Sequence, residues 1–252
     1  MLREPYMICG LPDVGFVAKQ AADYLVEKLK AKLFEEIYSP HFPPYVLIKR
    51  DGTVELMKNE FYFWENTEMK NDIVILTGNT QALTPEGQYE LVDKTLTRAK
   101  MLGVKKIFTL TSYLVNNRPQ NEKPKIYGVV TNPELKEELA TYEVQILEKG
   151  SIKGFNGLLL GMASLKKIEG VCLLSETIDY AGASGRMLID VKSAQTILEV
   201  LMKILGFQID LSDMGKQAKI TEEFIQKLEE SERQVLEQLS KTYPPRKQVY
   251  YI

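Results

Sequence analysis

The chain contains a single histidine, His41, and only two cysteines, Cys9 and Cys172, among 252 residues. One histidine argues against a His-based catalytic dyad and against a multi-histidine metal site, and two distant cysteines give no metal-ligand spacing. Both cysteines lie in short apolar runs typical of buried strands, so we expect reduced structural thiols and a cytoplasmic protein. No catalytic, metal-binding or cofactor-binding residue is predicted.

Long apolar runs and an excess of charge of one sign are also missing. No apolar stretch approaches the roughly 18 residues of a membrane-spanning helix, and the start at Met1–Pro5 does not resemble a signal peptide. Lys and Arg total 32 against 34 Asp and Glu, which leaves a net charge of −2 and no basic surface for nucleic acid. We therefore expect neither a membrane nor a nucleic-acid partner. The 44% of hydrophobic residues is enough for a sizeable core.

Short apolar runs of strand character alternate with segments of helical periodicity along most of the chain. The runs lie at 5–9, 32–38, 60–64, 73–76, 107–110, 126–131, 144–147 and 171–174, and the helical segments at 16–29, 85–102, 133–140, 155–165 and 191–205. Between Pro40 and Trp64, two alternating segments flank a turn at Asp51-Gly52, which predicts an inserted β-hairpin. The pattern predicts an α/β fold with three layers, Rossmann-like, around a largely parallel central sheet.

The composition changes near Leu211–Ile220, and we divide the chain into an α/β domain (1–215), a C-terminal helix (216–240) and a flexible tail (241–252). The final helix, expected from Thr221 to Leu239, carries an apolar stripe with spacings of four, seven and four residues. The stripe consists of Phe224, Leu228, Val235 and Leu239. It packs either on its own body or between subunits. We take these four residues as candidates for an oligomer interface.

A glycine loop, Gly10-Leu11-Pro12-Asp13-Val14-Gly15, connects the first predicted strand to the first helix. It imitates a dinucleotide-binding fingerprint, and Glu35 and Glu36 stand about 20 residues further on, where a ribose-binding acid would lie. However, Pro12 replaces the glycine that allows a pyrophosphate to approach the backbone, and it removes an amide donor. The loop therefore favours packing of helix on strand, with a nucleotide- or nucleoside-binding enzyme as the alternative.

The sequence ends in Tyr250-Tyr251-Ile252, after a stretch from Ser240 to Val249 that contains two prolines and mixed charge. Such a stretch is a poor helix or strand and is typical of an extended strap. Apolar and aromatic residues next to a terminal carboxylate either pack on the same chain or enter a pocket of a partner.

Three segments together resemble one family. The segment Gly10–Ala18 is similar to the opening motif of the proteasome-assembly-chaperone family, archaeal branch. Gly154–Gly161 resembles its second glycine motif, and Val171–Thr177 with Asp190 and the apolar helix Ala194–Leu205 resembles its closing unit. The resemblance covers about residues 1–215, and the terminal Tyr250, Tyr251 and Ile252 resemble tails that dock onto the proteasome α-ring.

The resemblance implies a Rossmann-like body, a homo-oligomer or a hetero-oligomer with a paralogue, binding to proteasome α-subunits, and no catalysis. An oligomeric scaffold for a paralogue, without contact to the proteasome, is an alternative that the sequence does not separate from this one.

Overall fold

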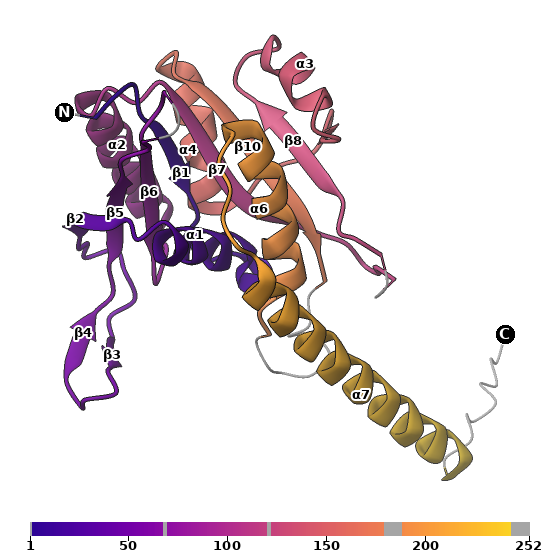
Figure 1. The fold of residues 1–252 in the computed structure, drawn as a ribbon. Helices are drawn as coiled ribbons and strands as arrows, with labels where there is room; N and C mark the ends of the chain where they lie inside the picture. The colour runs from indigo at the N-terminus through magenta and orange to yellow at the C-terminus, as the bar shows by residue number, and fades with distance from the viewer. Residues whose placement is uncertain (1, 68–69, 120–121, 179–187, 243–252) are drawn as a thin grey trace, which may run out of the picture.

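The computed structural model describes residues 2–67, 70–119, 122–178 and 188–242 (Figure 1). Its strands are β1 (Tyr6–Cys9), β2 (Lys32–Ile37), β3 (Val46–Ile48), β4 (Val54–Leu56), β5 (Asn59–Trp64), β6 (Ile73–Gly78), β7 (Lys106–Leu114), β8 (Ile126–Val130), β9 (Gln145–Ile146) and β10 (Glu169–Thr177). Its helices are the short 3-10 helix η1 (Val14–Phe16), α1 (Val17–Lys28), α2 (Pro85–Met101), α3 (Leu135–Ala140), α4 (Gly154–Leu165), α6 (Val191–Leu205) and α7 (Ser212–Thr242).

Eight strands form one sheet in the order β2-β5-β6-β1-β7-β10-β8-β9. The four central strands β6, β1, β7 and β10 run parallel to one another, while β5 pairs antiparallel with both β2 and β6, and β8 pairs antiparallel with β10. The central strands are made of β-branched and other apolar residues because both of their faces are covered. Their carboxyl ends meet at one edge of the sheet, which we call the carboxyl edge.

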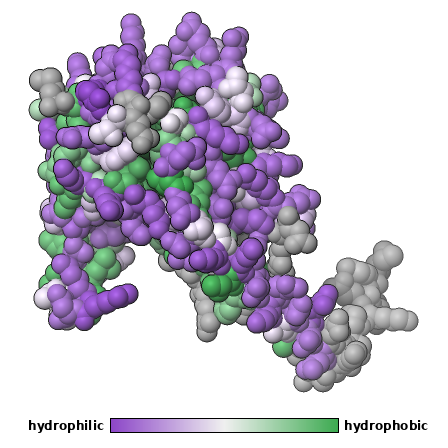
Figure 2. All heavy atoms as spheres, in the orientation of Figure 1, coloured by the Kyte–Doolittle hydropathy of each residue, from purple (hydrophilic) through white to green (hydrophobic). Residues whose placement is uncertain are grey.

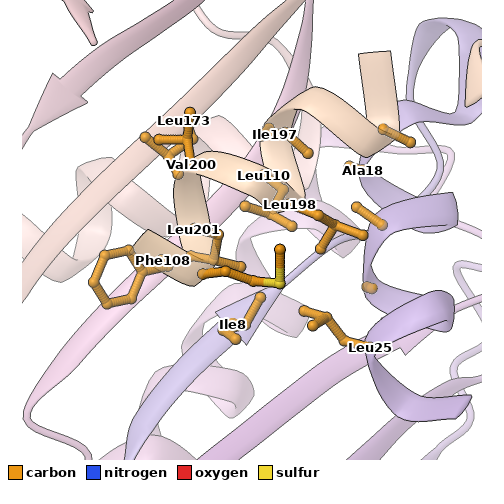
Figure 3. Close-up of a cluster of buried hydrophobic side chains, with 14 of the residues drawn as sticks. Ile8, Ala18, Leu25, Phe108, Leu110, Leu173, Ile197, Leu198, Val200 and Leu201 are labelled. Atoms are coloured by element: carbon orange, nitrogen blue, oxygen red, sulfur yellow. The ribbon is translucent and has the colours of Figure 1, made fainter. Parts of the chain in front are cut away.

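Two apolar cores fill the space between this sheet and its helices. One core, under α1 and α6, contains Ile8, Phe108, Leu173, Ile197 and Leu201 (Figure 3). The other core, under α2 and α4, is built from the residues of the same strands that point to the opposite face, such as Met7, Val74 and Ile107. This alternation produces three layers, so the predicted α/β fold with a largely parallel sheet is confirmed.

The predicted hairpin insertion is also confirmed. Strands β3 and β4 pair with each other in a separate two-stranded sheet. In the sequence this hairpin lies between β2 and β5. Because β2 runs in the same direction as β6, it ends at the carboxyl edge, and the hairpin projects beyond that edge (Figure 1).

One sequence expectation needs correction. The final helix begins at Ser212 rather than at Thr221, so the expected break at 211–220 is largely helical. The aromatic run of β5 packs within the chain: Phe61 contacts Phe34 on one side of the strand, and Trp64 contacts Phe207 on the other, both at 5.9 Å between ring centroids. This run therefore supplies core on both faces of the sheet.

Candidate functional site

The glycine loop lies at the carboxyl edge, where open parallel sheets usually bind ligands. A Cβ at Gly10 would lie 2.3 Å from the carbonyl oxygen of Ala18, and Gly15 adopts a positive φ of 68° against Thr177. Both glycines are thus required for the close packing of α1 on the sheet. The two glycines thus serve the packing of helix on strand, which the sequence favoured over nucleotide binding.

The chain's own side chains fill the surroundings of the loop. The Asp13 carboxylate accepts a hydrogen bond from the Ala18 amide (3.0 Å) in the first turn of α1, which is where a phosphate would meet the helix N-terminus. Asn156, near the start of α4, bonds both the amide and the carbonyl of Leu11 at 3.3 Å. Gln81 donates to the carbonyl of Pro12 at 2.5 Å. The geometry around Gly10, Pro12 and Gly15 therefore favours a structural loop over a nucleotide site.

Asp13 has an unusual charge state for an aspartate. Burial raises its pKa from 3.8 to about 7, and hydrogen bonds from the Ala18 amide and from Ser112 only partly oppose this effect. Burial thus favours the protonated form of this carboxyl. Its described hydrogen bonds join the glycine loop to α1 and to Ser112 of β7.

A second polar cluster closes the carboxyl edge at the start of α6. The N-cap residue Asp190 accepts from the Ser193 amide at 3.0 Å and from the Thr177 hydroxyl at 2.8 Å. It also forms a buried ion pair with Arg118 at 3.1 Å. Arg118 in turn donates to the Glu176 carbonyl (2.6 Å) and to the Ser193 hydroxyl (2.7 Å). These contacts join the β7–β8 connection, β10 and α6 and stabilise their junction.

Helix α7 leaves the body at this same edge. Its start is tied to the far end of α1 by Lys28–Asp213 (2.8 Å), and Glu222 contacts Lys192 in the first turn of α6 (2.5 Å). It therefore runs antiparallel to α6, from the opposite edge of the sheet to the carboxyl edge. The last buried residue described in α7 is Ile225. Beyond it, the helix projects away from the body (Figure 1), and we call residues 226–242 the stalk.

The face of α7 that packs on the body differs from the predicted stripe. Met214, Ala218 and Ile225 are the buried residues, with spacings of four and seven. Phe224 and Val235 lie on a neighbouring face and are 40% and 54% exposed. The side chains of the other two stripe residues, Leu228 and Leu239, lie outside the described residues. Where it is described, the stripe is thus available to a partner.

The terminal residues Tyr250, Tyr251 and Ile252 also lie outside the described residues. The described chain ends at Thr242, at the tip of the stalk and far from the sheet (Figure 1).

The described part of the chain was also compared with what a metal site, a histidine site or a membrane span would require. No group of three or more His, Cys, Asp or Glu side chains there is arranged to hold a metal ion. His41 contacts Glu90 at 3.2 Å and the Thr84 hydroxyl at 3.3 Å, beside the N-terminus of α2. None of the described helices is long and apolar enough to cross a bilayer.

These features define a class: a three-layer α/β protein with a packed glycine loop at the carboxyl edge of its sheet and a last helix that projects as a stalk. Comparison with known proteins gives the same answer in more detail. The model of the PAC2 family matches residues 7–229, and the chain belongs to this family. The resemblance to the proteasome-assembly-chaperone family is thereby confirmed.

Two solved structures and one sequence illustrate the relationship. Pyrococcus furiosus PbaB, described as an archaeal proteasome activator, is 37% identical with a TM-score of 0.82, over 90% of this chain and 94% of that one. PbaA of the same organism, described as an archaeal homolog of proteasome-assembly chaperone, is 26% identical with a TM-score of 0.72, over 96% of both chains. The uncharacterized protein MJ1210 of Methanocaldococcus jannaschii is 36% identical over all of this chain and 93% of its own length.

Proposed function

We propose that this chain is a non-enzymatic, proteasome-assembly-chaperone-like protein that forms oligomers and docks its C-terminal tail onto proteasome α-subunits. The observation that carries the proposal is the stalk. It takes the end of the described chain away from the body, and the sequence that follows closes with Tyr250, Tyr251 and Ile252. PbaB, whose description names the proteasome, is similar over nearly the whole chain.

In the docking model, each of the three terminal residues makes a different contact, according to its chemistry. The Ile252 carboxylate meets a cationic group of the α-subunit, Tyr251 stacks and hydrogen-bonds at the mouth of the pocket, and Tyr250 buries its ring. An oligomer presents several such tails at once. Once one tail is bound, the next binds at an effective concentration on the order of millimolar, which raises the overall affinity without a new kind of contact.

A pull-down of recombinant proteasome α-subunits tests the proposal. The full-length chain should retain them, and a chain that ends at Val249 should lose them while its circular dichroism spectrum stays unchanged. Two matched single changes separate the docking motif from the strap: Tyr251→Ala should abolish retention, and Tyr243→Ala should preserve it. Equal retention by the truncated and full-length chains would contradict tail docking and favour the alternative of a scaffold for a paralogue.

A further inference from the structure

A groove lies at the edge of the sheet opposite to the stalk. The parallel strands β1, β6, β7 and β10 all begin at this edge, which we call the amino edge (Figure 1). Helices α2 and α4 end there, because each of them leads into one of these strands. The end of α2 and the connections that follow the two helices line a groove of about 650 Å³. A volume of this size is within the range of binding pockets.

The groove is lined with positive charge. Among the described residues that line it, three are lysines, Lys100, Lys105 and Lys166, and none is acidic. Lys166 pairs with Asp93 at 2.7 Å, whereas the described chain supplies no ion-pair partner for Lys100 or Lys105. Two of the three ammonium groups are therefore available to an anionic partner.

The helix ends account for part of this charge. The C-terminus of a helix carries about half a negative charge, which a lysine in the last turn offsets. This effect explains Lys100 in α2 and Lys166 after α4, but not Lys105, which lies in the connection to β7. The hydrogen bond and the charge of Lys70 (2.7 Å), and more weakly the charge of Lys105, lower the pKa of Glu4, so this carboxylate already has its ion-pair partner. The groove thus keeps positive charge beyond what the fold uses.

Apolar carbon is exposed beside the same groove. Leu96, Val104 and Ile168 belong to its lining. Met101 and Leu165, the last residues of α2 and α4, are 72% and 85% exposed, and no large apolar side chain of the described chain is more exposed than Leu165. Hydrophilic residues dominate the top of the molecule in Figure 2, where this edge lies, so exposed apolar side chains are unusual there. Their place next to the groove favours a partner that covers them.

The shape and the chemistry of the groove favour a peptide segment over other anionic partners. A membrane surface is usually bound by an amphipathic helix that lies in the interface, not by a concave groove. Nucleic acid is usually bound with aromatic and arginine side chains, and neither kind occurs among the described residues that line the groove. A free anion would use the lysines but would leave Met101 and Leu165 uncovered. A segment that carries both carboxylates and aliphatic side chains complements both properties of the site.

We propose that the groove at the amino edge binds an acidic segment of a partner protein in which carboxylates alternate with aliphatic side chains. The carboxylates meet Lys100, Lys105 and Lys166, and an aliphatic side chain enters between Val104 and Ile168. The site lies at the opposite edge from the stalk (Figure 1). The inference therefore goes beyond the proposed function and does not depend on it.

Short fluorescent peptides test the chemistry of the occupant with the full-length chain. A peptide of alternating glutamate and leucine should raise its fluorescence anisotropy on binding, and an increase in salt from about 50 to about 500 mM should weaken the binding several-fold. A peptide of alternating lysine and leucine and one of alternating glutamate and serine should not bind. No binding of the glutamate–leucine peptide, or equal binding of either control peptide, would overturn the proposal. Tighter binding of a single-stranded oligonucleotide or of phosphatidylserine vesicles would do the same.

Matched charge reversals locate the site. Lys100→Glu combined with Lys105→Glu should weaken binding of the glutamate–leucine peptide at least about tenfold. Lys216→Glu combined with Lys219→Glu makes the same change of charge at exposed positions of α7 and should leave binding unchanged. Leu165→Ser should weaken binding several-fold without a change in the circular dichroism spectrum, because the side chain is largely exposed.

Unchanged binding by the first double variant would overturn the proposal, and so would an equal loss in both double variants, which would reflect net charge alone. The first double variant should still retain α-subunits in the pull-down. That measurement keeps a failure of the groove apart from a failure of tail docking.

Discussion

At the carboxyl edge, the loops that close the sheet and the two elements that project beyond it use their side chains in opposite ways. Around the loops, polar side chains accept hydrogen bonds from the chain's own backbone amides, as Asp13, Asn156 and Asp190 do. On the projections, Ile48 and Val235 expose apolar carbon to water. Polar groups that bond to the chain's own backbone serve the fold, whereas exposed apolar surface favours a protein partner. The difference makes the hairpin and the exposed side of α7 the candidate surfaces for a protein partner.

The first prediction tests the polar cluster around Asp190 at the carboxyl edge. Asp190→Ala should lower the free energy of unfolding by about 4 kcal/mol, because it leaves the buried charge of Arg118 without its partner and removes the cap of α6. Asp93→Ala is the matched control: Asp93 pairs with Lys166 on the surface, and its loss should cost less than about 0.5 kcal/mol. Urea denaturation measures both. Similar losses would mean that the Asp190 cluster does not hold the edge together.

The second prediction concerns the glycine loop. Gly10→Ala should cost about 3 kcal/mol, because the new Cβ would lie 2.3 Å from the Ala18 carbonyl oxygen and force α1 off the sheet. Gly161→Ala meets no atom within 4 Å and lies inside α4, so it should stabilise the protein by up to about 1 kcal/mol. Thermal unfolding distinguishes the two. A tolerated Gly10→Ala would reopen the loop as a place for a ligand to approach.

The third prediction concerns the two faces of α7. Met214→Ala should cost roughly 2 to 3 kcal/mol, since Met214 is fully buried under the helix, whereas Ile220→Ala, on the exposed side, should change stability by less than about 0.5 kcal/mol. Hydrogen exchange of α7 amides should rise with the first change only. Equal effects would mean that the side of α7 that carries Ile220 also packs on the body.

The features that the sequence does predict are those that depend on neighbours in the chain. The runs at Ile73–Leu76 and Val171–Leu174 indicate buried strands, and the turn at Asp51-Gly52 indicates the hairpin. Two helix caps are local in the same way: the Thr84 hydroxyl accepts from the Gly87 amide at 3.1 Å, and Asp190 accepts from the Ser193 amide. Local periodicity, turn chemistry and capping decide these features, so a single segment is sufficient to see them.

The features that the sequence does not predict depend on distant parts of the chain. Arg118 lies in a segment that is polar enough to be a solvent-exposed loop, yet it is buried because its partner Asp190 lies 72 residues away. Helix α7 has apolar residues at helical spacing on two neighbouring faces, so spacing alone does not tell which face packs on α6. For the same reason the early start at Ser212 is missed, because Lys28, Tyr24 and α6 supply the contacts that hold this first part of α7.

The last prediction compares one aspartate of the loops with one of the projections. Burial raises the folded-state pKa of Asp13 from 3.8 to about 7. Between about pH 4 and about pH 7 the folded protein therefore keeps a proton that the unfolded chain has released, and the free energy of unfolding falls as the pH rises. Each pKa unit corresponds to about 1.4 kcal/mol, and the partial exposure of Asp13 reduces the expected loss to about 2 kcal/mol.

Asp13→Asn should abolish this loss, because the amide oxygen still accepts from Ala18 but cannot ionise. Asp51, at the hairpin tip, should behave in the opposite way. Hydrogen bonds from the hydroxyl and amide of Thr53 lower its pKa, so the stability it contributes is present above its unfolded-state pKa and is lost as the pH falls through the folded one. Unfolding curves of both Asp→Asn variants across pH 3 to 8 test this pair. If the difference between wild type and Asp13→Asn is constant across that range, the pKa of Asp13 does not change on folding, and the burial of this carboxyl is contradicted.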